Sequence, residues 1–234
     1  MSRFIKKIGY HDFTLLVSIP RNHPDMAKAA EYGGADAIKV HLNVKHPASG
    51  HIFGSLKQER KGIEAILKKV SFPVGVVPGA DKTATLAELD EMEKMGIDFF
   101  DIFAHDMPLP YLNSDLGKMV CIDGRYTPEQ VKKLADLGVD VFEASVIPHD
   151  GYGKPAVLSD LARWKALTEN LETPVMVSTQ RKLLPEECRI LAQVGVRGIV
   201  IGVVVTGETT KGVQQITKAF RIAIDEINRS RKLH

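Results

Sequence analysis

The strongest constraint on the fold of this chain is an eight-residue pattern that occurs four times. The copies begin at Gly34, Gly96, Gly138 and Gly195 and read GADAIKVH, GIDFFDIF, GVDVFEAS and GVRGIVIG. Each copy follows a segment whose apolar residues recur at helical spacing, and its glycine stands where a helix C-terminal cap belongs. The sequence therefore predicts a repeating unit of helix, glycine and strand.

A second type of apolar strand lies between these units. Its copies are TLLVSIP from Thr14, PVGVVPG from Pro73, KMVCIDG from Lys118 and PVMVSTQ from Pro174. Eight short apolar strands, mostly separated by helices, call for a parallel sheet covered by helices. In a chain of 234 residues they predict one domain over residues 1–234, a closed (β/α)8 TIM barrel, a fold of roughly 200 to 400 residues. A doubly wound open sheet is the alternative, and the fourfold regularity favours the barrel.

Three local signals refine this topology. Thr127 to Gln130 form a capping box with proline at the first helical position, which predicts the start of the fifth helix. Only MPLPYLNSDLGK separates two strands in the middle of the chain, so the fourth helix should be degenerate. The leading segment RFIKKIGYHDF is expected to cover the bottom of the barrel.

Alignment of the four repeats predicts which side chains face inward. The fourth and sixth residues after each glycine are apolar and suit the surface beneath the helices: Ile38, Phe100, Phe142, Ile199, Val40, Ile102, Ala144 and Ile201. The alternate positions then face into the barrel. They hold Lys39, Asp101, Glu143 and Val200, followed by His41, Phe103, Ser145 and Gly202.

Lys39, Asp101 and Glu143 are the predicted catalytic residues. Alternate strands of a TIM barrel contribute to one interior layer, so these three groups should converge near the C-terminal mouth, where active sites of this fold lie. The alternative is a buried ion group that only balances its own charge. Removing ions from water costs several kcal/mol each, and a barrel built for stability alone could use an apolar residue, as it does at Val200. The functional interpretation is therefore favoured.

The loops after the seventh and eighth strands predict a phosphate site. They read STQRKLLPEE and GVVVTGETTKG, and such loops commonly bind phosphate through backbone amides and a helix N-terminus. The predicted ligands are Arg181, Lys182, Gly202, Thr206 and Gly207. Alternatively, Arg181 and Lys182 are solvated residues at a helix start.

Two long loops are expected to close over a ligand: HLNVKHPASGHIFGSLKQER after the second strand and VIPHDGYGKPAVLS after the sixth. Polar residues near the strand ends predict substrate contacts by His41, His105, Asp123, Ser145, Ser178 and Arg181. The pairs His105-Asp106 and His149-Asp150 fit substrate contacts or proton carriers, and loop caps equally well. Either Asp123 faces inward or Ile122 takes its place.

No cofactor and no metal site are expected. His41, His46 and His51 match no tight metal-ligand spacing and lack companion carboxylates. Cys121 and Cys188, the only cysteines, are predicted to be reduced, buried and not catalytic.

The composition argues against two classes of partner. Lysine and arginine total 31 against 29 aspartate and glutamate, a net charge of +2, and the chain has no basic stripe with interleaved aromatics, so nucleic acid is not an expected partner. No segment approaches the roughly 18 apolar residues of a membrane span, and no signal peptide is recognisable. We therefore expect a cytoplasmic protein without a membrane partner. A homo-oligomer is possible.

Several segments together resemble one known family. They are LLVSIP followed by a helix and EYGGADAIK, TLAELDEMEKMGIDFFDI, TPEQVKKLADLGVDVFEAS with DGYG after it, and PVMVSTQRKLLPEECRILAQVGVRGIVIG ending in ITKAF. The sequence resembles the phosphate-binding TIM-barrel superfamily, and most closely the N-acetylmannosamine-6-phosphate 2-epimerases. The resemblance implies the barrel fold and a phosphorylated, sugar-like ligand, and Arg181 matches the family's arginine.

The family's two catalytic positions differ in this chain. The family's lysine follows the third strand, where this chain has Pro78-Gly79, and its acid ends the seventh strand, where this chain has Ser178 or Thr179.

The predicted function is an isomerase or epimerase that acts on a small phosphorylated sugar by proton abstraction next to a carbonyl. Glu143 or Asp101 would be the base, and Lys39, kept protonated by the two carboxylates, would stabilise the oxyanion. Two alternatives remain open: an aldolase-like lyase in which Lys39 forms a Schiff base, and a barrel that binds a phosphorylated metabolite without catalysis.

Overall fold

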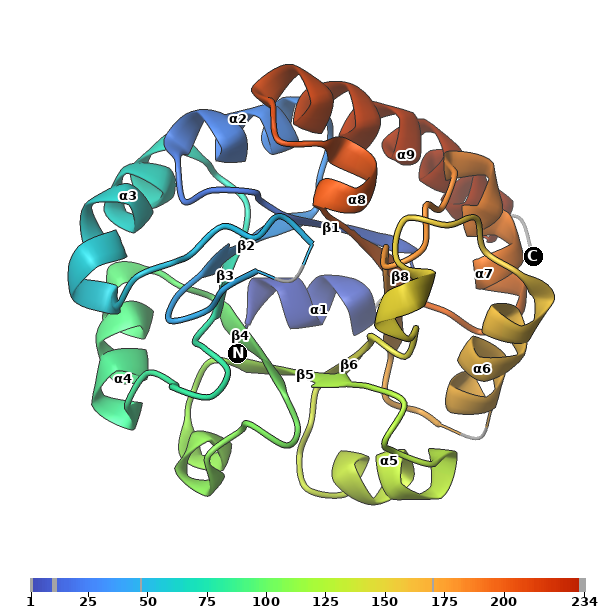
Figure 1. Cartoon of the computed structure of the whole chain (residues 1–234), viewed down its shortest axis with the longest axis horizontal. Helices are drawn as coiled ribbons and strands as arrows, with labels where there is room; N and C mark the ends of the chain where they lie inside the picture. Colours follow the sequence, from blue (N-terminus) through green and yellow to red (C-terminus); the bar gives the residue numbers. More distant parts are fainter. Residues whose placement is uncertain (1, 10–11, 47, 170, 232–234) are drawn as a thin grey trace.

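The strands form a closed parallel barrel. The computed structural model describes residues 2–9, 12–46, 48–169 and 171–231, and within them each strand pairs with the next along the chain until β8 closes on β1 (Figure 1). This confirms the predicted (β/α)8 barrel. The strands are β1 (Thr14–Ser18), β2 (Ala37–His41), β3 (Val74–Val77), β4 (Phe99–Phe103), β5 (Gly117–Ile122), β6 (Val141–Ala144), β7 (Val175–Ser178) and β8 (Gly198–Ile201).

Helices surround the barrel on its outside (Figure 1). They are α2 (Pro24–Tyr32), α3 (Leu56–Lys69), α4 (Leu86–Met95), α5 (Pro128–Ala135), α6 (Leu158–Thr168), α7 (Cys188–Gln193) and α9 (Thr210–Arg231), with the short α8 (Val203–Thr206) directly after β8. Within the part of the chain that the structure describes, three 3₁₀ turns complete the list: η1 (Leu109–Asn113), η2 (His149–Gly151) and η3 (Pro185–Glu187). The connection between β4 and β5 contains η1 instead of an α-helix, which confirms the predicted degenerate unit.

Caps predicted from the sequence set the ends of these helices. The Thr127 hydroxyl accepts a hydrogen bond from the Gln130 amide at 3.3 Å, and the Gln130 side chain accepts from the Thr127 amide at 2.9 Å, just ahead of α5. After α4, Gly96 has a φ of 109°, a left-handed conformation that glycine adopts without strain. The turn signals of the repeat therefore depend on contacts within a few residues of each helix end.

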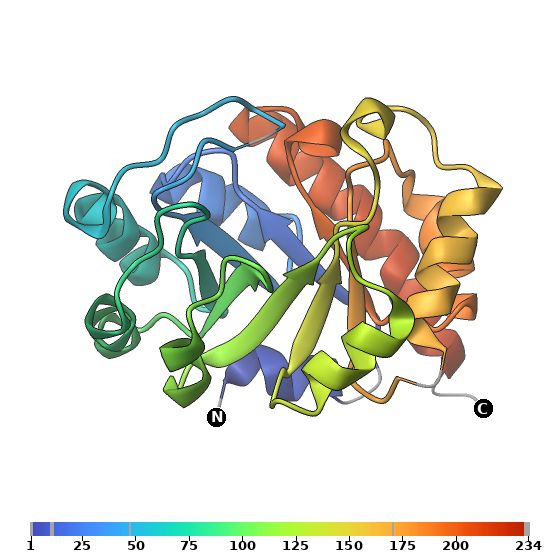
Figure 2. The same cartoon turned by 60° about the horizontal axis from the view of Figure 1, so that its bottom comes forward.

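The bottom of the barrel is closed by α1 (Arg3–Gly9), which lies beneath the strands (Figure 2). Phe4 and Ile8 are buried, and Phe4 stacks on Phe99 with ring centroids 4.6 Å apart. This confirms the expected role of the leading segment, of which Tyr10 and His11 lie outside the described residues. We call the apolar cluster at this end the lower layer; it consists of Phe4, Ile8, Leu16, Ala37, Phe99, Met119, Val141, Met176 and Val200. Val200 belongs to this cluster and also lines the pocket at the other end of the barrel.

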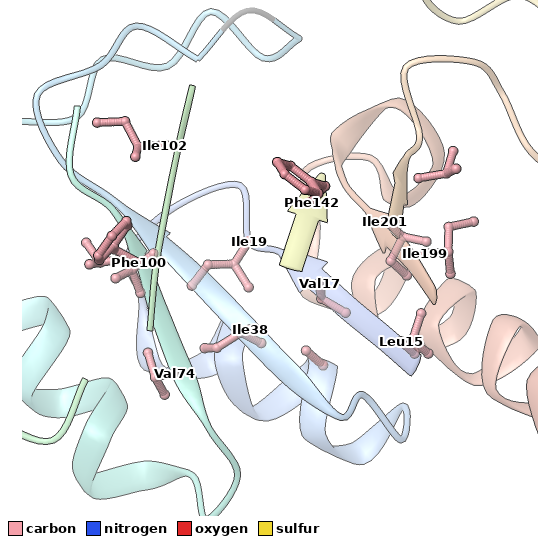
Figure 3. Packing of buried hydrophobic residues seen from close by; sticks show 14 of the residues in the cluster. Leu15, Val17, Ile19, Ile38, Val74, Phe100, Ile102, Phe142, Ile199 and Ile201 are labelled. Carbon is pink, nitrogen blue, oxygen red and sulfur yellow. The ribbon is translucent and has the colours of Figure 1, made fainter. Parts of the chain in front are cut away.

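The opposite faces of the strands pack against the helices (Figure 3). All eight repeat positions predicted to lie there are buried in this outer core: Ile38, Val40, Phe100, Ile102, Phe142, Ala144, Ile199 and Ile201. Burying such a side chain stabilises the fold by about 1.5 to 3 kcal/mol. The outer core thus fixes the alternation that turns the remaining strand positions inward.

Among the described residues, no helix has the length and apolar character needed to cross a membrane.

Candidate active site

A pocket of about 270 Å³ opens at the C-terminal ends of the strands. Lys39, Asp101 and Glu143 line this pocket, with only 6%, 2% and 4% of their surfaces exposed. They come from β2, β4 and β6, which are alternate strands, and lie above the lower layer. The three charged groups therefore converge as the repeat alignment predicts, and we call them the charged layer.

Lys39 holds the charged layer together. Its Nζ donates to Oε2 of Glu143 at 2.5 Å and also to Oδ2 of Asp101. Burial lowers the pKa of the lysine, but the charges of the two carboxylates outweigh this effect and raise the pKa above its ordinary value. Lys39 is therefore an ammonium ion at neutral pH.

The two carboxyl groups differ in protonation. Burial and the nearby charge of Glu143 raise the pKa of Asp101 well above its ordinary value. Burial also raises the pKa of Glu143, but the charge of Lys39 and the hydrogen bonds from Asp101 and Lys39 outweigh it and lower the pKa. Because two carboxyl groups share one ammonium ion, Asp101 is the one that binds a proton more readily and Glu143 is the one that ionises more readily. Among the described residues, Oδ1 of Asp101 has no hydrogen-bond partner.

His41 lies at the mouth end of β2 and also lines the pocket. Its Nε2 is 3.1 Å from the Ser18 hydroxyl, and its ring stacks on Phe53 at 4.7 Å. Asn22 fixes its backbone from both sides, donating to the His41 carbonyl at 2.7 Å and accepting from the His41 amide at 3.0 Å. Burial, with His46 and Lys39 nearby, lowers the pKa of His41 well below its ordinary value, so the imidazole is neutral.

Two further predicted contacts reach the same pocket. Ser145 and Ser178 both line it, and their hydroxyl oxygens are 2.8 Å apart. Ser178 also donates to the Ala144 carbonyl at 3.2 Å. These hydroxyls form the polar side of the pocket next to Glu143.

His105 and Asp123 lie outside the pocket lining. Asp123 accepts from Arg125 Nε at 2.8 Å, and Arg125 Nη2 lies 2.6 Å from Nε2 of His105. Ile122 is buried in the outer core, so it faces the helices and does not replace Asp123 on the inner side. The structure joins His105 and Asp123 to each other through Arg125 and not to the charged layer.

Of the predicted phosphate ligands, Gly202 lines the pocket. Its amide donates to the Thr179 hydroxyl at 3.0 Å. The hydroxyl of the buried Thr206 donates to the Gly207 carbonyl at 2.9 Å, and Gly207 is exposed at the end of α8.

Arg181 and Lys182 do not line the pocket. Arg181 Nε lies 2.7 Å from Oδ2 of the fully buried Asp160, and Nη1 donates to the Gly151 carbonyl at 3.1 Å. Lys182 is exposed. The Arg181 guanidinium is thus engaged in joining α6 to the loops after β6 and β7.

Sequence reasoning missed several pocket residues: Ser18, Tyr152, Thr179, Gln180, Lys45 and His46. Gln180 donates to the Tyr152 hydroxyl at 2.6 Å and accepts from the Ile147 amide at 3.0 Å, which fastens the loop after β6 to the end of β7. Ser18 and Gln180 could have been found from one signal, because both stand at or just after the end of an odd-numbered strand.

The loop after β2 folds into an antiparallel hairpin beside the pocket. The Phe53 amide donates to the Val44 carbonyl at 2.9 Å, and the His46 amide donates to the His51 carbonyl at 2.8 Å. Lys45 and Ile52 pair between them as an antiparallel β-bridge. We call residues 43–54 the mouth hairpin; Pro47 lies outside the described residues. Val44, Lys45, His46 and Ala48 line the pocket, so this long loop borders the same space as the charged layer.

Both cysteines are buried free thiols. Cys121 lines the pocket, and burial, with Glu143 and Asp101 nearby, raises the pKa of its thiol well above the ordinary value. Burial raises the pKa of Cys188 to about 12. Across the described ranges, no cluster of three or more histidine, cysteine, aspartate or glutamate side chains is suited to hold a metal ion.

No family model matches the sequence, and no curated protein matches it either. Solved structures match the fold over nearly the whole chain. A tryptophan synthase of Mycobacterium tuberculosis superposes with a TM-score of 0.74 at 14% identity, covering 95% of this chain and 98% of the other. Thiamine phosphate pyrophosphorylase from Pyrococcus furiosus superposes with a TM-score of 0.65 at 17% identity, covering 94% of this chain and 98% of the other.

A 3-hexulose-6-phosphate synthase superposes with a TM-score of 0.64 at 17% identity, covering 90% of this chain and 99% of the other. At such identities the likeness establishes the TIM-barrel fold. It does not show membership of the epimerase family, so that resemblance remains a prediction.

Proposed function

We propose that this chain is an isomerase or epimerase that acts on a small phosphorylated sugar by moving a proton on the carbon next to a carbonyl. The observation that carries the proposal is the charged layer, in which an ionised Glu143, a protonated Asp101 and a protonated Lys39 meet at the base of the pocket. A base and an electrophile held side by side are what this reaction requires.

Each member of the charged layer has a role in the proposed reaction. Glu143 takes the proton from carbon, and the electrons of that C–H bond form the double bond of an enediol while the carbonyl π electrons move to oxygen. Lys39 stabilises the resulting oxyanion, and Asp101 can give it a proton. Return of a proton to the opposite face of the same carbon gives an epimer, and return to the neighbouring carbon gives an isomer.

The phosphorylated substrate class has separate support. Two of the structural neighbours, thiamine phosphate pyrophosphorylase and 3-hexulose-6-phosphate synthase, have a phosphorylated compound in their names. The proposal places the phosphate beside Gly202 and Val203, which line the pocket at the start of α8, with Lys45 of the mouth hairpin adding positive charge. Arg181 has no part in this placement because Asp160 holds its guanidinium.

Solvent deuterium exchange tests the proposal. Wild-type protein is incubated in D₂O with a panel of aldose and ketose phosphates, and carbon-bound deuterium is read by NMR. We expect label next to the carbonyl of at least one compound, none with Lys39→Ala, and labelling about 1000-fold slower with Glu143→Gln. A folded wild type that labels no member of a broad panel would overturn the proposal.

The ion pairs of Lys39 favour proton transfer over Schiff-base chemistry. A Schiff base forms from a neutral amine, whereas Asp101 and Glu143 keep this amine protonated. Borohydride reduction in the presence of the labelled sugar phosphate, followed by mass spectrometry, separates the two reactions. We expect no adduct on Lys39; a reduced adduct there would favour the aldolase-like lyase.

A further inference from the structure

His46 of the mouth hairpin presents a side chain to the pocket that the proposed reaction has not yet used. It lines the pocket together with the charged layer, and its ring meets the edge of His41 with centroids 5.2 Å apart. Burial and the charge of Lys39 lower the pKa of His46, and the charge of Glu143 raises it. His46 thus enters the pocket from the hairpin, whereas Lys39 and Glu143 enter from the strands.

Ser49 determines which nitrogen of His46 carries the proton. The Ser49 backbone amide lies 3.3 Å from Nδ1 of His46, and the Ser49 hydroxyl lies 3.2 Å from the same atom. A backbone N–H can only donate, so Nδ1 is an acceptor and a neutral ring carries its proton on Nε2. Among the described residues Nε2 has no hydrogen-bond partner, so its N–H is available to a ligand.

The His46 ring is neutral over the physiological range. Burial and the positive charge of Lys39 lower its pKa to about 4. A neutral imidazole N–H can polarise a carbonyl without adding a second positive charge beside an ammonium ion. The pocket therefore contains two donors of different kinds, the charged Nζ of Lys39 and the neutral Nε2 of His46.

We propose that His46 is a catalytic residue that donates its Nε2–H to one of the two neighbouring oxygens of an enediolate, while Lys39 serves the other oxygen. The inference rests on the proposed function and narrows its substrate class to α-hydroxy carbonyl sugar phosphates. In such a compound the carbon that loses its proton bears a hydroxyl next to the carbonyl. Two of the three Lys39 N–H groups already bind carboxylates, so a second donor is needed for the second oxygen.

Substitution of His46 tests this role with the compound that wild type labels in D₂O. We expect His46→Ala to lower the kcat for exchange about 100-fold, the usual effect of losing one oxyanion donor, with KM changed less than threefold. His46→Gln, which keeps a neutral N–H donor, should recover the rate to within tenfold of wild type. His51→Gln is the matched control because His51 is on the same hairpin but exposed; its rate should stay within twofold.

A purely structural role for His46 would give a different pattern. If the folded His46→Ala variant exchanges within threefold of wild type, the proposal is overturned. If His46→Ala does not fold, the exchange rate of wild type is compared with the rates of His46→Gln and Ser49→Ala. The Ser49→Ala variant lacks the hydroxyl contact to Nδ1.

The tautomer is measured independently on ¹⁵N-histidine-labelled wild type. We expect the long-range ¹H–¹⁵N pattern of an Nε2-protonated, neutral ring from pH 7 down to pH 5. A ring protonated on Nδ1, or on both nitrogens, at pH 7 would contradict the assignment without any substrate. If wild type labels nothing, the proposed function fails and this role fails with it; if wild type labels a sugar phosphate and His46→Ala does too, only the role of His46 fails.

Discussion

The lower layer and the charged layer occupy the same barrel interior, one above the other, and they are built on opposite principles. In the lower layer, Phe4 and Phe99 stack and exclude both water and charge. In the charged layer, Lys39, Asp101 and Glu143 are equally buried but ionic. Apolar burial stabilises the fold, whereas burying ions costs solvation energy that their attraction only partly returns. The difference suggests that the lower layer maintains the barrel and the charged layer maintains an activity.

The largest expected loss of activity comes from breaking the charged layer in two ways. Lys39→Met leaves two buried carboxyl groups without a cation, so we expect the free energy of unfolding to fall by about 3 kcal/mol. The triple variant Lys39→Met, Asp101→Leu, Glu143→Met replaces all three polar groups by apolar ones, so its free energy of unfolding should be within about 1 kcal/mol of the wild-type value or above it. Both variants should lack exchange activity.

Denaturant unfolding followed by circular dichroism measures these changes. Lys118→Met is the matched control, because that half-buried lysine donates to the Ser114 carbonyl at 2.8 Å and holds no buried carboxylate. It should cost about 1 kcal/mol or less. A triple variant that is as unstable as Lys39→Met would show that the charged layer is structural, and the contrast between the layers would disappear.

Glu143→Gln sharpens the same contrast by removing the base and keeping its shape. The amide oxygen can still accept from Lys39, so stability should change little, while exchange should fall about 1000-fold. Asp101→Asn should cost less, about 10- to 100-fold, because in the proposed reaction Asp101 acts in its protonated form, which its raised pKa favours. Single-turnover exchange rates for the two variants check the order. A Glu143→Gln variant that is faster than Asp101→Asn would reverse the assigned roles.

Substitution in the lower layer should have the opposite consequence. Phe99→Ala removes a fully buried ring beneath the charged layer and should lower the free energy of unfolding by about 3 to 4 kcal/mol. The kcat of the folded fraction should stay within twofold. Leu109→Ala, at a side chain 80% exposed on η1, serves as control and should cost under about 0.5 kcal/mol. A large kcat loss in Phe99→Ala would mean that the layers are not separable.

The fold and the charged layer could be predicted because they follow from periodicity. The eight-residue repeat contains both the glycine of each turn and the alternation of inward and outward side chains along each strand. The aligned positions of Lys39, Asp101 and Glu143 therefore already imply a shared layer. The same alternation predicts that Ile38 and Phe100 face the helices, as they do.

The rest of the site depends on contacts between residues far apart in the sequence, which no short-range pattern predicts. Arg181 looks like an anion ligand in sequence, yet Asp160, 21 residues away, takes its guanidinium. No sequence pattern marks His46 as a pocket residue, because its place in the pocket results from the folding of the mouth hairpin. Its tautomer depends in addition on a single backbone amide, that of Ser49.

The protonation of His46 links the mouth hairpin to the stability of the barrel. The pKa of His46 is lowered from 6.5 in the unfolded chain to about 4 in the native protein, because burial and the positive charges of Lys39 and His51 outweigh the opposing charge of Glu143. Between these values the unfolded chain binds more protons, so stability is present above pH 6.5 and is lost as the pH falls toward 4.

For wild type we therefore expect this group to remove about 3 kcal/mol of the free energy of unfolding between pH 7 and pH 4. His46→Gln, which cannot take up the proton, should lose correspondingly less over that range, whereas the exposed control His51→Gln should follow wild type. Urea unfolding at half-unit pH steps measures the difference. Parallel curves for wild type and His46→Gln would mean that His46 is protonated or solvated in the native protein, and the mouth hairpin would then not hold a neutral donor over the charged layer.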